Sequence, residues 1–189
     1  MIQYFQISKS NSCFFLFAFQ RKIPFIILKY VKSDTFSGRK GQFMFSKVLS
    51  ATIDGARCVP VCVEADVSNG LPMFSMVGDL TSQVKEAQER VRTAIKNMGI
   101  TIPAKRITVN LSPADIRKAG SRFDLPIAAA LLAAFGLIEK EKLEGVMLAG
   151  ELGLDGKVNP VSGILPLAEV ARESGCTLCV VPEKNYREA

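Results

Sequence analysis

Apolar and polar residues alternate along two runs that read as β-strands, 47–53 and 58–67. The turn-forming pair Asp54-Gly55 separates them, so the pattern predicts an antiparallel hairpin. A third strand is predicted over 73–77, where a short apolar run lies between two glycine-containing turns.

The period of the apolar positions changes from two to about 3.6 residues at Ser82, which indicates an amphipathic helix. Gly99 stands where a glycine commonly ends a helix. The apolar face of this helix is predicted to consist of Val84, Ala87, Val91, Ala94, Ile95 and Met98. Its outer face carries opposite charges four positions apart, including Glu86 and Arg90, which is typical of a solvated surface.

Short strands and helices alternate in the second half of the chain. Strands are predicted over 107–111, 146–151, 157–161 and 177–181, and helices over 125–135 and 165–174. The first of these helices is nearly all apolar and is therefore expected to be buried. Asp124 is predicted as its N-cap residue, with Pro126 in its first turn.

The order of these elements mixes hairpins with crossover connections, which favours an α+β fold. We predict one domain over residues 44–189, built as a two-layer α/β sandwich with a mixed sheet. A chain of 189 residues with 48% hydrophobic and 22% charged side chains is long enough to bury one full core.

Residues 1–43 differ from the rest in composition. They hold seven Lys and Arg against one acidic residue, which leaves 17 basic and 17 acidic residues in the predicted domain. The net charge of +6 is therefore no argument for nucleic-acid binding by the domain as a whole. The apolar runs in 1–43 are shorter than the roughly 18 to 20 residues of a membrane span. We interpret 1–43 as a non-native or disordered extension whose deletion leaves stability nearly unchanged.

The chain has five Cys and no His, and an odd count argues against a disulfide framework. A cytoplasmic location is the simplest interpretation. Cys58 with Cys62 and Cys176 with Cys179 have spacings that could hold zinc. Both pairs fall in predicted strands, where buried thiols are ordinary core residues, so no metal site is predicted.

Four long phrases cover nearly all of the predicted domain. They are NGLPMFSMVGD (69–79), VKEAQERVRTAIKNMG (84–99), RITVNLSPADIRKAGSRFDLPIA (106–128) and GELGLDGKVNPVSGILPLA (150–168). In this order they resemble the magnesium-chelatase-like AAA+ ATPases of the ComM/YifB type. The resemblance implies an N-terminal ChlI domain with the fold of the Lon protease C-terminal domain, in the ribosomal-protein-like superfamily.

The resemblance also implies a parent protein that works as a homo-hexameric motor, with ATP and Mg, on branched DNA during recombination and natural transformation. No GxxxxGK[ST] phosphate loop occurs in this chain, so no cofactor is assigned to it. The chain is expected to end before the motor. The implied partners are DNA and the chain's own AAA+ motor, with no membrane.

Lon-type proteases use a serine nucleophile and a lysine base. The resemblance places Arg122 at the position of the serine and Leu165 at the position of the lysine, with Ser121 one residue early. Because leucine cannot accept a proton, we predict no catalytic residue and assign Ser121 to turn chemistry. The alternatives are a Ser/Lys peptidase-like domain, or a subunit of a metal chelatase in tetrapyrrole synthesis.

Basic residues cluster in sequence around the strand at 107–111. They are Lys105, Arg106, Arg117, Lys118 and Arg122. If the strand start and the following loop approach each other, these cations could contact DNA phosphates or dock onto the motor. We predict a non-catalytic accessory domain that uses the loop 112–124 as its working surface; the alternative is a solvated loop without a partner.

Overall fold

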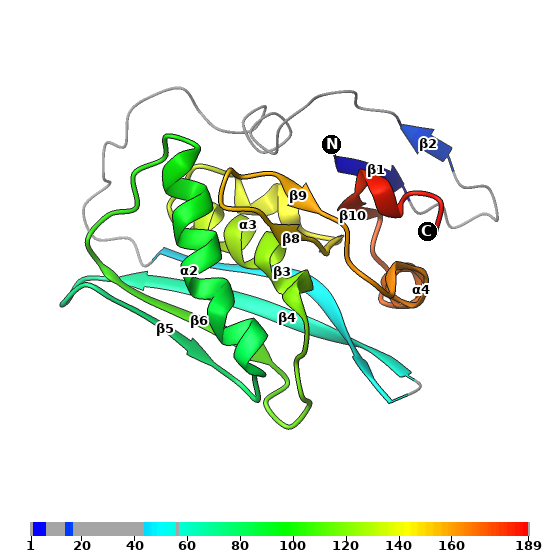
Figure 1. Cartoon of the computed structure of the whole chain (residues 1–189), viewed down its shortest axis with the longest axis horizontal. Coiled ribbons are helices and arrows are strands. Elements are labelled where there is room, and N and C mark those ends of the chain that lie inside the picture. Colours follow the sequence, from blue (N-terminus) through cyan, green and yellow to red (C-terminus); the bar gives the residue numbers. More distant parts are fainter. Residues whose placement is uncertain (1, 7–13, 17–43, 56, 189) are drawn as a thin grey trace.

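The computed structural model describes residues 2–6, 14–16, 44–55 and 57–188. They form an eight-stranded mixed sheet in the order β2-β1-β10-β7-β3-β4-β6-β5, together with a separate two-stranded sheet of β8 and β9 (Figure 1). The strands are β1 (Ile2–Gln6), β2 (Phe14–Leu16), β3 (Met44–Asp54), β4 (Arg57–Ser68), β5 (Met73–Val77), β6 (Arg106–Ser112), β7 (Val146–Leu148), β8 (Glu151–Leu152), β9 (Val158–Asn159) and β10 (Leu178–Pro182). The α-helices of the described residues are α2 (Ser82–Asn97), α3 (Asp124–Ala134) and α4 (Ile164–Glu173), and short 3-10 helices are η1 (Ser121–Phe123), η2 (Lys140–Leu143) and η3 (Glu183–Asn185).

The β3–β4 hairpin forms the centre of the sheet, as the alternating pattern predicts. Leu49 of β3 lies opposite Cys62 of β4, and the two strands pair along their full length. β6 joins β4 antiparallel, whereas β5 joins β6 in parallel and β7 joins β3 in parallel. The sheet is therefore mixed, and the predicted α+β fold class is confirmed.

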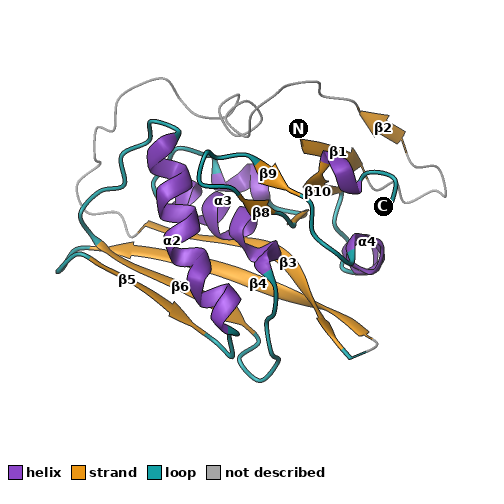
Figure 2. Ribbon diagram, viewed as in Figure 1, coloured by secondary structure: helices purple, strands orange, loops and turns teal. Residues whose placement is uncertain are grey.

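The helices cover the two faces of the sheet unequally (Figure 2). α2 and α3 pack on one face, where Ser46 of β3 donates a hydrogen bond to the Ala130 carbonyl at 2.5 Å. α4 packs against the opposite face at the β10 end, in a smaller apolar cluster that includes Ala51 and Met147. Among the described elements, the fold is thus a two-layer sandwich over β5 and β6, and α4 adds a third layer against β3, β4 and β10.

The apolar patterns of α2 and α3 predict their packing correctly. Every residue of α3 is buried, because this helix lies between the sheet and α2. The buried face of α2 consists of Val84, Ala87, Val91, Ala94 and Ile95, while Met98 caps the helix half-buried. Gly99 follows with a φ of 83°, a left-handed conformation that favours glycine.

The predicted N-cap role of Asp124 is wrong. Phe123 holds the N-cap position of α3, and Asp124 is the first helical residue with its side chain completely buried. Its carboxylate is drawn inward by Arg90, so it caps no helix end. A cap residue would instead turn its side chain back to the helix's own N–H groups.

Two short strands lie within the predicted extension of residues 1–43. β1 pairs antiparallel with β10, and β2 pairs antiparallel with β1. The rest of that segment lies outside the described residues, so its interpretation as an extension remains a prediction. Across the described part of the chain, no helix is both long enough and apolar enough to cross a membrane.

Candidate functional site

The loop between β6 and α3 is held against the start of α2. The backbone of Lys118 accepts a hydrogen bond from the N–H of Thr81 at 3.1 Å and donates one to the Asp79 carbonyl at 2.8 Å. The Lys118 ammonium donates to the Pro113 carbonyl. Its side chain is completely buried, and this burial lowers the pKa of Lys118. Lys118 therefore fixes the loop from inside and offers no charge to a partner.

Arg122 is also buried, with 7% of its surface exposed. Its Nη2 donates to the Ser162 carbonyl at 3.0 Å, and burial lowers the pKa of the guanidinium. Gly163 lies against the same group with a φ of 74°, and a Cβ there would meet Ile53 Cδ1 at 2.5 Å and Arg122 Nη2 at 3.4 Å. The guanidinium and the Ile53 side chain thus occupy the space beside this glycine.

Ser121 lines a half-open cleft of about 450 Å³ between the start of α2, η1 and the segment before α4. The Ser121 hydroxyl donates to a carboxylate oxygen of Glu151, whose other oxygen accepts from Asn159 Nδ2 at 3.2 Å. The cleft is lined by Gln83, Glu86, Arg90, Gly120, Ser121, Arg122, Glu151, Pro160, Val161 and Ser162. None of these is a lysine, so no amine base faces the serine within the cleft.

A buried ion pair joins α2 to the start of α3 at one wall of this cleft. Arg90 donates to Asp124 through Nε at 2.7 Å and through Nη2 at 3.0 Å, and the Leu152 N–H donates to the same carboxylate at 3.1 Å. Burial raises the pKa of Asp124, while the bonds from Arg90 and Leu152 lower it. The pair predicted from the sequence, Arg90 with Glu86, also forms, with Nη1 and Oε2 3.6 Å apart. The Glu86 side chain is largely exposed, so the buried Asp124 is the main partner of Arg90.

The five basic residues predicted as one cluster do not share a surface. Lys105 and Arg106 lie at the start of β6, and the other three follow its end, about 20 Å away along a seven-residue strand. Arg106 and Arg117 are exposed and Lys105 is half-buried, whereas the other two are buried. Contact of these residues with DNA or the motor therefore stays a prediction, and only Lys105, Arg106 and Arg117 are accessible enough to make such a contact.

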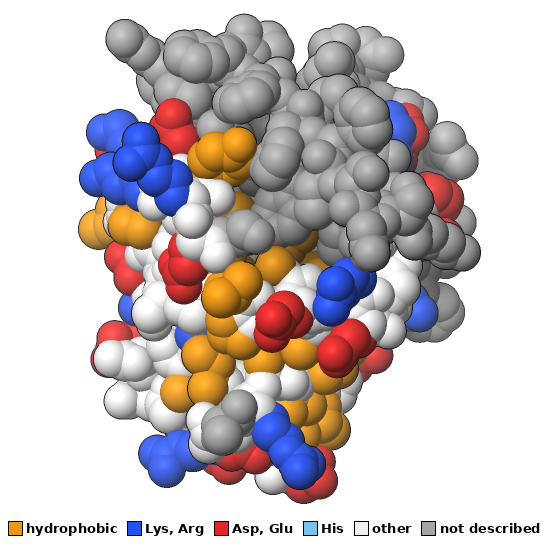
Figure 3. Space-filling model, turned by 90° about the vertical axis from the view of Figure 1, so that its right-hand side faces the viewer, with side chains coloured by type: hydrophobic (Ala, Val, Ile, Leu, Met, Phe, Trp, Pro, Cys, Tyr) orange, Lys and Arg blue, Asp and Glu red, His pale blue; other side chains and the backbone are white. Residues whose placement is uncertain are grey.

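Leu165, at the position of the Lon lysine, is 50% exposed in the first turn of α4. Figure 3 shows the side of the molecule that carries α4 and the end of the β3–β4 hairpin. Hydrophobic side chains are exposed on this side between charged ones. A lysine amine at that point would reach water, which does not favour the neutral form that a base requires.

The cysteines give no indication of metal chemistry. Burial raises the pKa of all four thiols that the structure describes, to about 12 for Cys179. Zinc binds the thiolate form, which such surroundings disfavour. Among the described residues there is no group of three or more His, Cys, Asp or Glu that could hold a metal ion.

Comparisons with known proteins identify the relatives of this chain. Residues 63–185 match the family described as subunit ChlI of Mg-chelatase. YifB of Salmonella typhimurium is 46% identical over 129 residues, which cover 68% of this chain and 26% of that protein. Competence protein ComM of Haemophilus influenzae is 42% identical over 142 residues, which cover 75% of this chain and 28% of that protein.

A more distant match connects the fold to proteases. Lon protease 2 of Bacillus subtilis is 29% identical over 106 residues, 56% of this chain and 19% of that protein. The chain spans about a quarter of the length of the YifB and ComM relatives. Their matches, and the ChlI match over most of the domain, lead to one assignment: this chain belongs to the Mg-chelatase ChlI family, in the group that contains YifB and ComM.

Proposed function

We propose that this chain is a non-catalytic accessory domain of a magnesium-chelatase-like AAA+ ATPase that acts in DNA processing. The observation that carries the proposal is the buried Arg122 at the position where the Lon resemblance expects a nucleophile. The name of the relative ComM, a competence protein, supports a role in natural transformation, and the resemblance to the ComM/YifB family extends the proposal to recombination and branch migration.

The chemistry of the cleft argues against a retained peptidase. A serine becomes a nucleophile when a neighbouring base removes its proton, and Lon-type enzymes use a lysine for this. Here Ser121 donates to Glu151, and a carboxylate is a weaker base than a neutral amine. Leu165 stands at the position of the lysine and cannot take its place. The peptidase alternative is therefore less well supported than a binding role.

The remaining parts of the proposal concern the parent protein. ATP and Mg would be bound by the motor domain, and the parent would assemble as a homo-hexamer in the cytoplasm. The accessory domain would contact DNA through accessible cations at the start of β6, such as Lys105 and Arg106, and the motor through the exposed Arg117. A chelatase in tetrapyrrole synthesis is the other candidate, and only the ChlI family description favours it.

Peptidase activity is tested by incubating the purified chain with unfolded proteins and fluorogenic peptides. We expect no turnover above that of a buffer blank, and no difference between the wild type and Ser121→Ala. Reproducible cleavage that disappears in Ser121→Ala would show that the hydroxyl is a nucleophile and would overturn the non-catalytic assignment.

DNA binding is tested by titrating branched, duplex and single-stranded DNA with the chain over a salt series. We expect binding that weakens as salt rises, because each phosphate contact releases counterions. Absence of binding to all three DNA forms at low salt would leave motor docking as the role of the domain. Loss of hexamer assembly in a parent protein that lacks the domain would then separate docking from the absence of any partner.

A further inference from the structure

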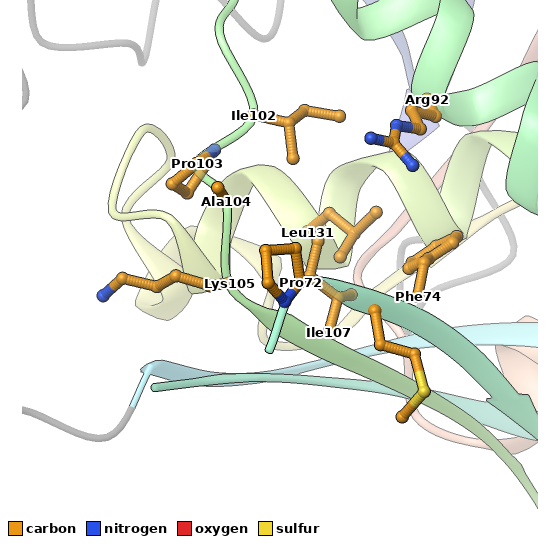
Figure 4. A pocket seen from close by; sticks show the side chains of 10 residues that line it. Pro72, Phe74, Arg92, Ile102, Pro103, Ala104, Lys105, Ile107 and Leu131 are labelled. Atoms are coloured by element: carbon orange, nitrogen blue, oxygen red, sulfur yellow. The ribbon is translucent and has the colours of Figure 1, made fainter. Parts of the chain in front are cut away.

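A small hollow opens between the sheet edge and α2 (Figure 4), at the opposite end of the fold from α4 (Figure 1). Its volume is about 150 Å³. Its walls are mostly apolar and come from β5, β6, α2, α3 and the connection after α2. The residues that line it are Pro72, Met73, Phe74, Arg92, Ile102, Pro103, Ala104, Lys105, Ile107 and Leu131. An engineered apolar cavity of this size admits one benzene-sized ring, so a single aromatic ring fits here.

The Phe74 ring forms part of the wall. Phe74 pairs with Ile107 across the β5–β6 ladder, and both side chains lie on the face that α2 and α3 cover. The ring is half-buried, so one part of it packs on the core while another faces the hollow. β5 is the edge strand of the sheet, so no further described strand lies beyond this wall.

Two cations accompany this apolar wall. Arg92 extends from α2 toward the space between Ile102 and Phe74, and Lys105 extends outward at the other side (Figure 4). Neither has an ion-pair or side-chain hydrogen-bond partner within the described ranges. No acidic residue lines the hollow. Unpaired positive charge beside an aromatic wall suits a ligand that combines a flat ring with negative charge.

We propose that this hollow receives one base of single-stranded DNA, stacked on Phe74, with the adjoining phosphates at Arg92 and Lys105. The inference rests on the proposed DNA-processing function. It adds the surface that binds DNA and the form of DNA, single-stranded, that this surface prefers. Base stacking on aromatic side chains combined with a cationic track is the usual way in which proteins hold single strands. A duplex keeps its bases stacked inside and can offer the hollow only phosphates.

The volume of the hollow adds a preference among bases. A space for one six-membered ring accepts a pyrimidine more readily than a two-ring purine. We therefore expect tighter binding of oligothymidylate than of oligodeoxyadenylate at equal length. A peptide of acidic residues without aromatic side chains would satisfy the two cations equally well but has no ring for the Phe74 wall.

The test measures the affinity of the full 189-residue chain for strands of about 12 nucleotides, within the range of single-strand site sizes. One strand is oligothymidylate and the other is an abasic strand with the same phosphates. The variants are Phe74→Leu, which keeps an apolar wall and removes the ring, and Phe45→Leu as control. Phe45 is a 48% exposed phenylalanine on the opposite face of the sheet.

We expect the wild type to prefer the thymidine strand to the abasic strand about five- to hundredfold, the range of one stacked base. Phe74→Leu should lose most of this preference, and Phe45→Leu should keep it. Equal affinity for the two strands, or an unchanged preference in Phe74→Leu, would overturn the proposal while leaving DNA binding intact. If the wild type binds neither strand nor any branched or duplex DNA, the proposed DNA function itself is wrong.

Discussion

Two arginines two residues apart on α2 have opposite environments. Arg90 forms two hydrogen bonds to the completely buried Asp124 and keeps 23% of its own side chain exposed. Arg92 is exposed, has no ion pair among the described residues, and reaches over the apolar hollow at the sheet edge. A buried charge requires a partner, whereas an exposed cation can remain available to a ligand. The position on the helix thus decides which arginine holds the fold and which is free to bind.

The same contrast separates the two hollows beside α2. In the cleft of Ser121, most charged groups are engaged in polar contacts, as in the Ser121–Glu151 and Arg90–Asp124 contacts, and among the buried side-chain atoms of its lining only Nη1 of Arg122 has no hydrogen-bond partner among the described residues. In the hollow at β5, the apolar wall and the cations have no such mutual contacts in the described structure. The contacts in the Lon-like cleft hold the scaffold together, whereas the cations at the sheet edge remain available to the proposed ligand.

The largest effect is expected for Arg90→Ala. Its removal leaves the Asp124 carboxylate buried with the Leu152 N–H as its remaining hydrogen-bond donor. Loss of one partner of a buried ion pair costs about 3 kcal/mol or more. We expect the free energy of unfolding at neutral pH, measured by urea denaturation, to fall by that amount. A loss below about 1 kcal/mol would show that the pair contributes little to the fold.

The Arg90→Ala deficit should depend on pH. Burial raises the pKa of Asp124 above 3.8, so the folded state binds a proton more readily than the unfolded state. The stability that this proton uptake contributes is present at low pH and is lost as pH rises through the folded pKa. Arg90 lowers the pKa of Asp124, so in Arg90→Ala the carboxyl group of the folded state keeps its proton up to a higher pH. At neutral pH the variant therefore loses more stability than it does in acid. The stability gap between wild type and variant should therefore narrow as pH falls from about 8 toward about 5. A gap that widens on acidification would contradict the assignment.

Replacement of the buried Arg122 should depend on the size of the new side chain. Arg122→Met fills the same space without a buried charge, so we expect a change within about 1 kcal/mol. Arg122→Ala leaves a cavity beside Ile53 and Gly163 and should cost about 2 kcal/mol. Chemical denaturation of both variants measures the difference. Equal losses in the two would mean that the charge of Arg122, rather than its volume, stabilises the fold.

The smallest effect on stability is expected for Arg92→Ala. An exposed side chain without a partner contributes less than about 0.5 kcal/mol to folding. Thermal unfolding, compared with Arg172→Ala on the exposed side of α4, measures this. A substantial loss would place Arg92 in the scaffold with Arg90 and remove the contrast between them.

Local periodicity predicts most of the fold. The apolar alternation identifies the β3–β4 hairpin, and the 3.6-residue period identifies the buried face of α2 almost residue by residue. These features depend on neighbours in sequence, which a pattern records directly. The four long phrases predict the family, and the comparisons confirm it.

The candidate site was less predictable, because it depends on contacts between distant segments. Asp124 precedes an apolar helix and looks like a cap, but its partner Arg90 is 34 positions away. Lys118 and Arg122 look like surface cations because the sequence does not show the carbonyls of Pro113 and Ser162 that receive them. The hollow at β5 escapes prediction for the same reason, since its walls come from five segments of the chain.

The most direct test of a binding surface at the sheet edge is the salt dependence of single-strand binding. Each phosphate contact of a single strand contributes a slope of about −0.7 in log K against log salt. Arg92→Ala combined with Lys105→Ala should therefore flatten the slope by about 1.4, whereas Arg117→Ala in the loop before α3 should leave it unchanged. If Arg117→Ala flattens the slope and the double variant does not, the DNA contact lies at the loop, and the account of the sheet edge is contradicted.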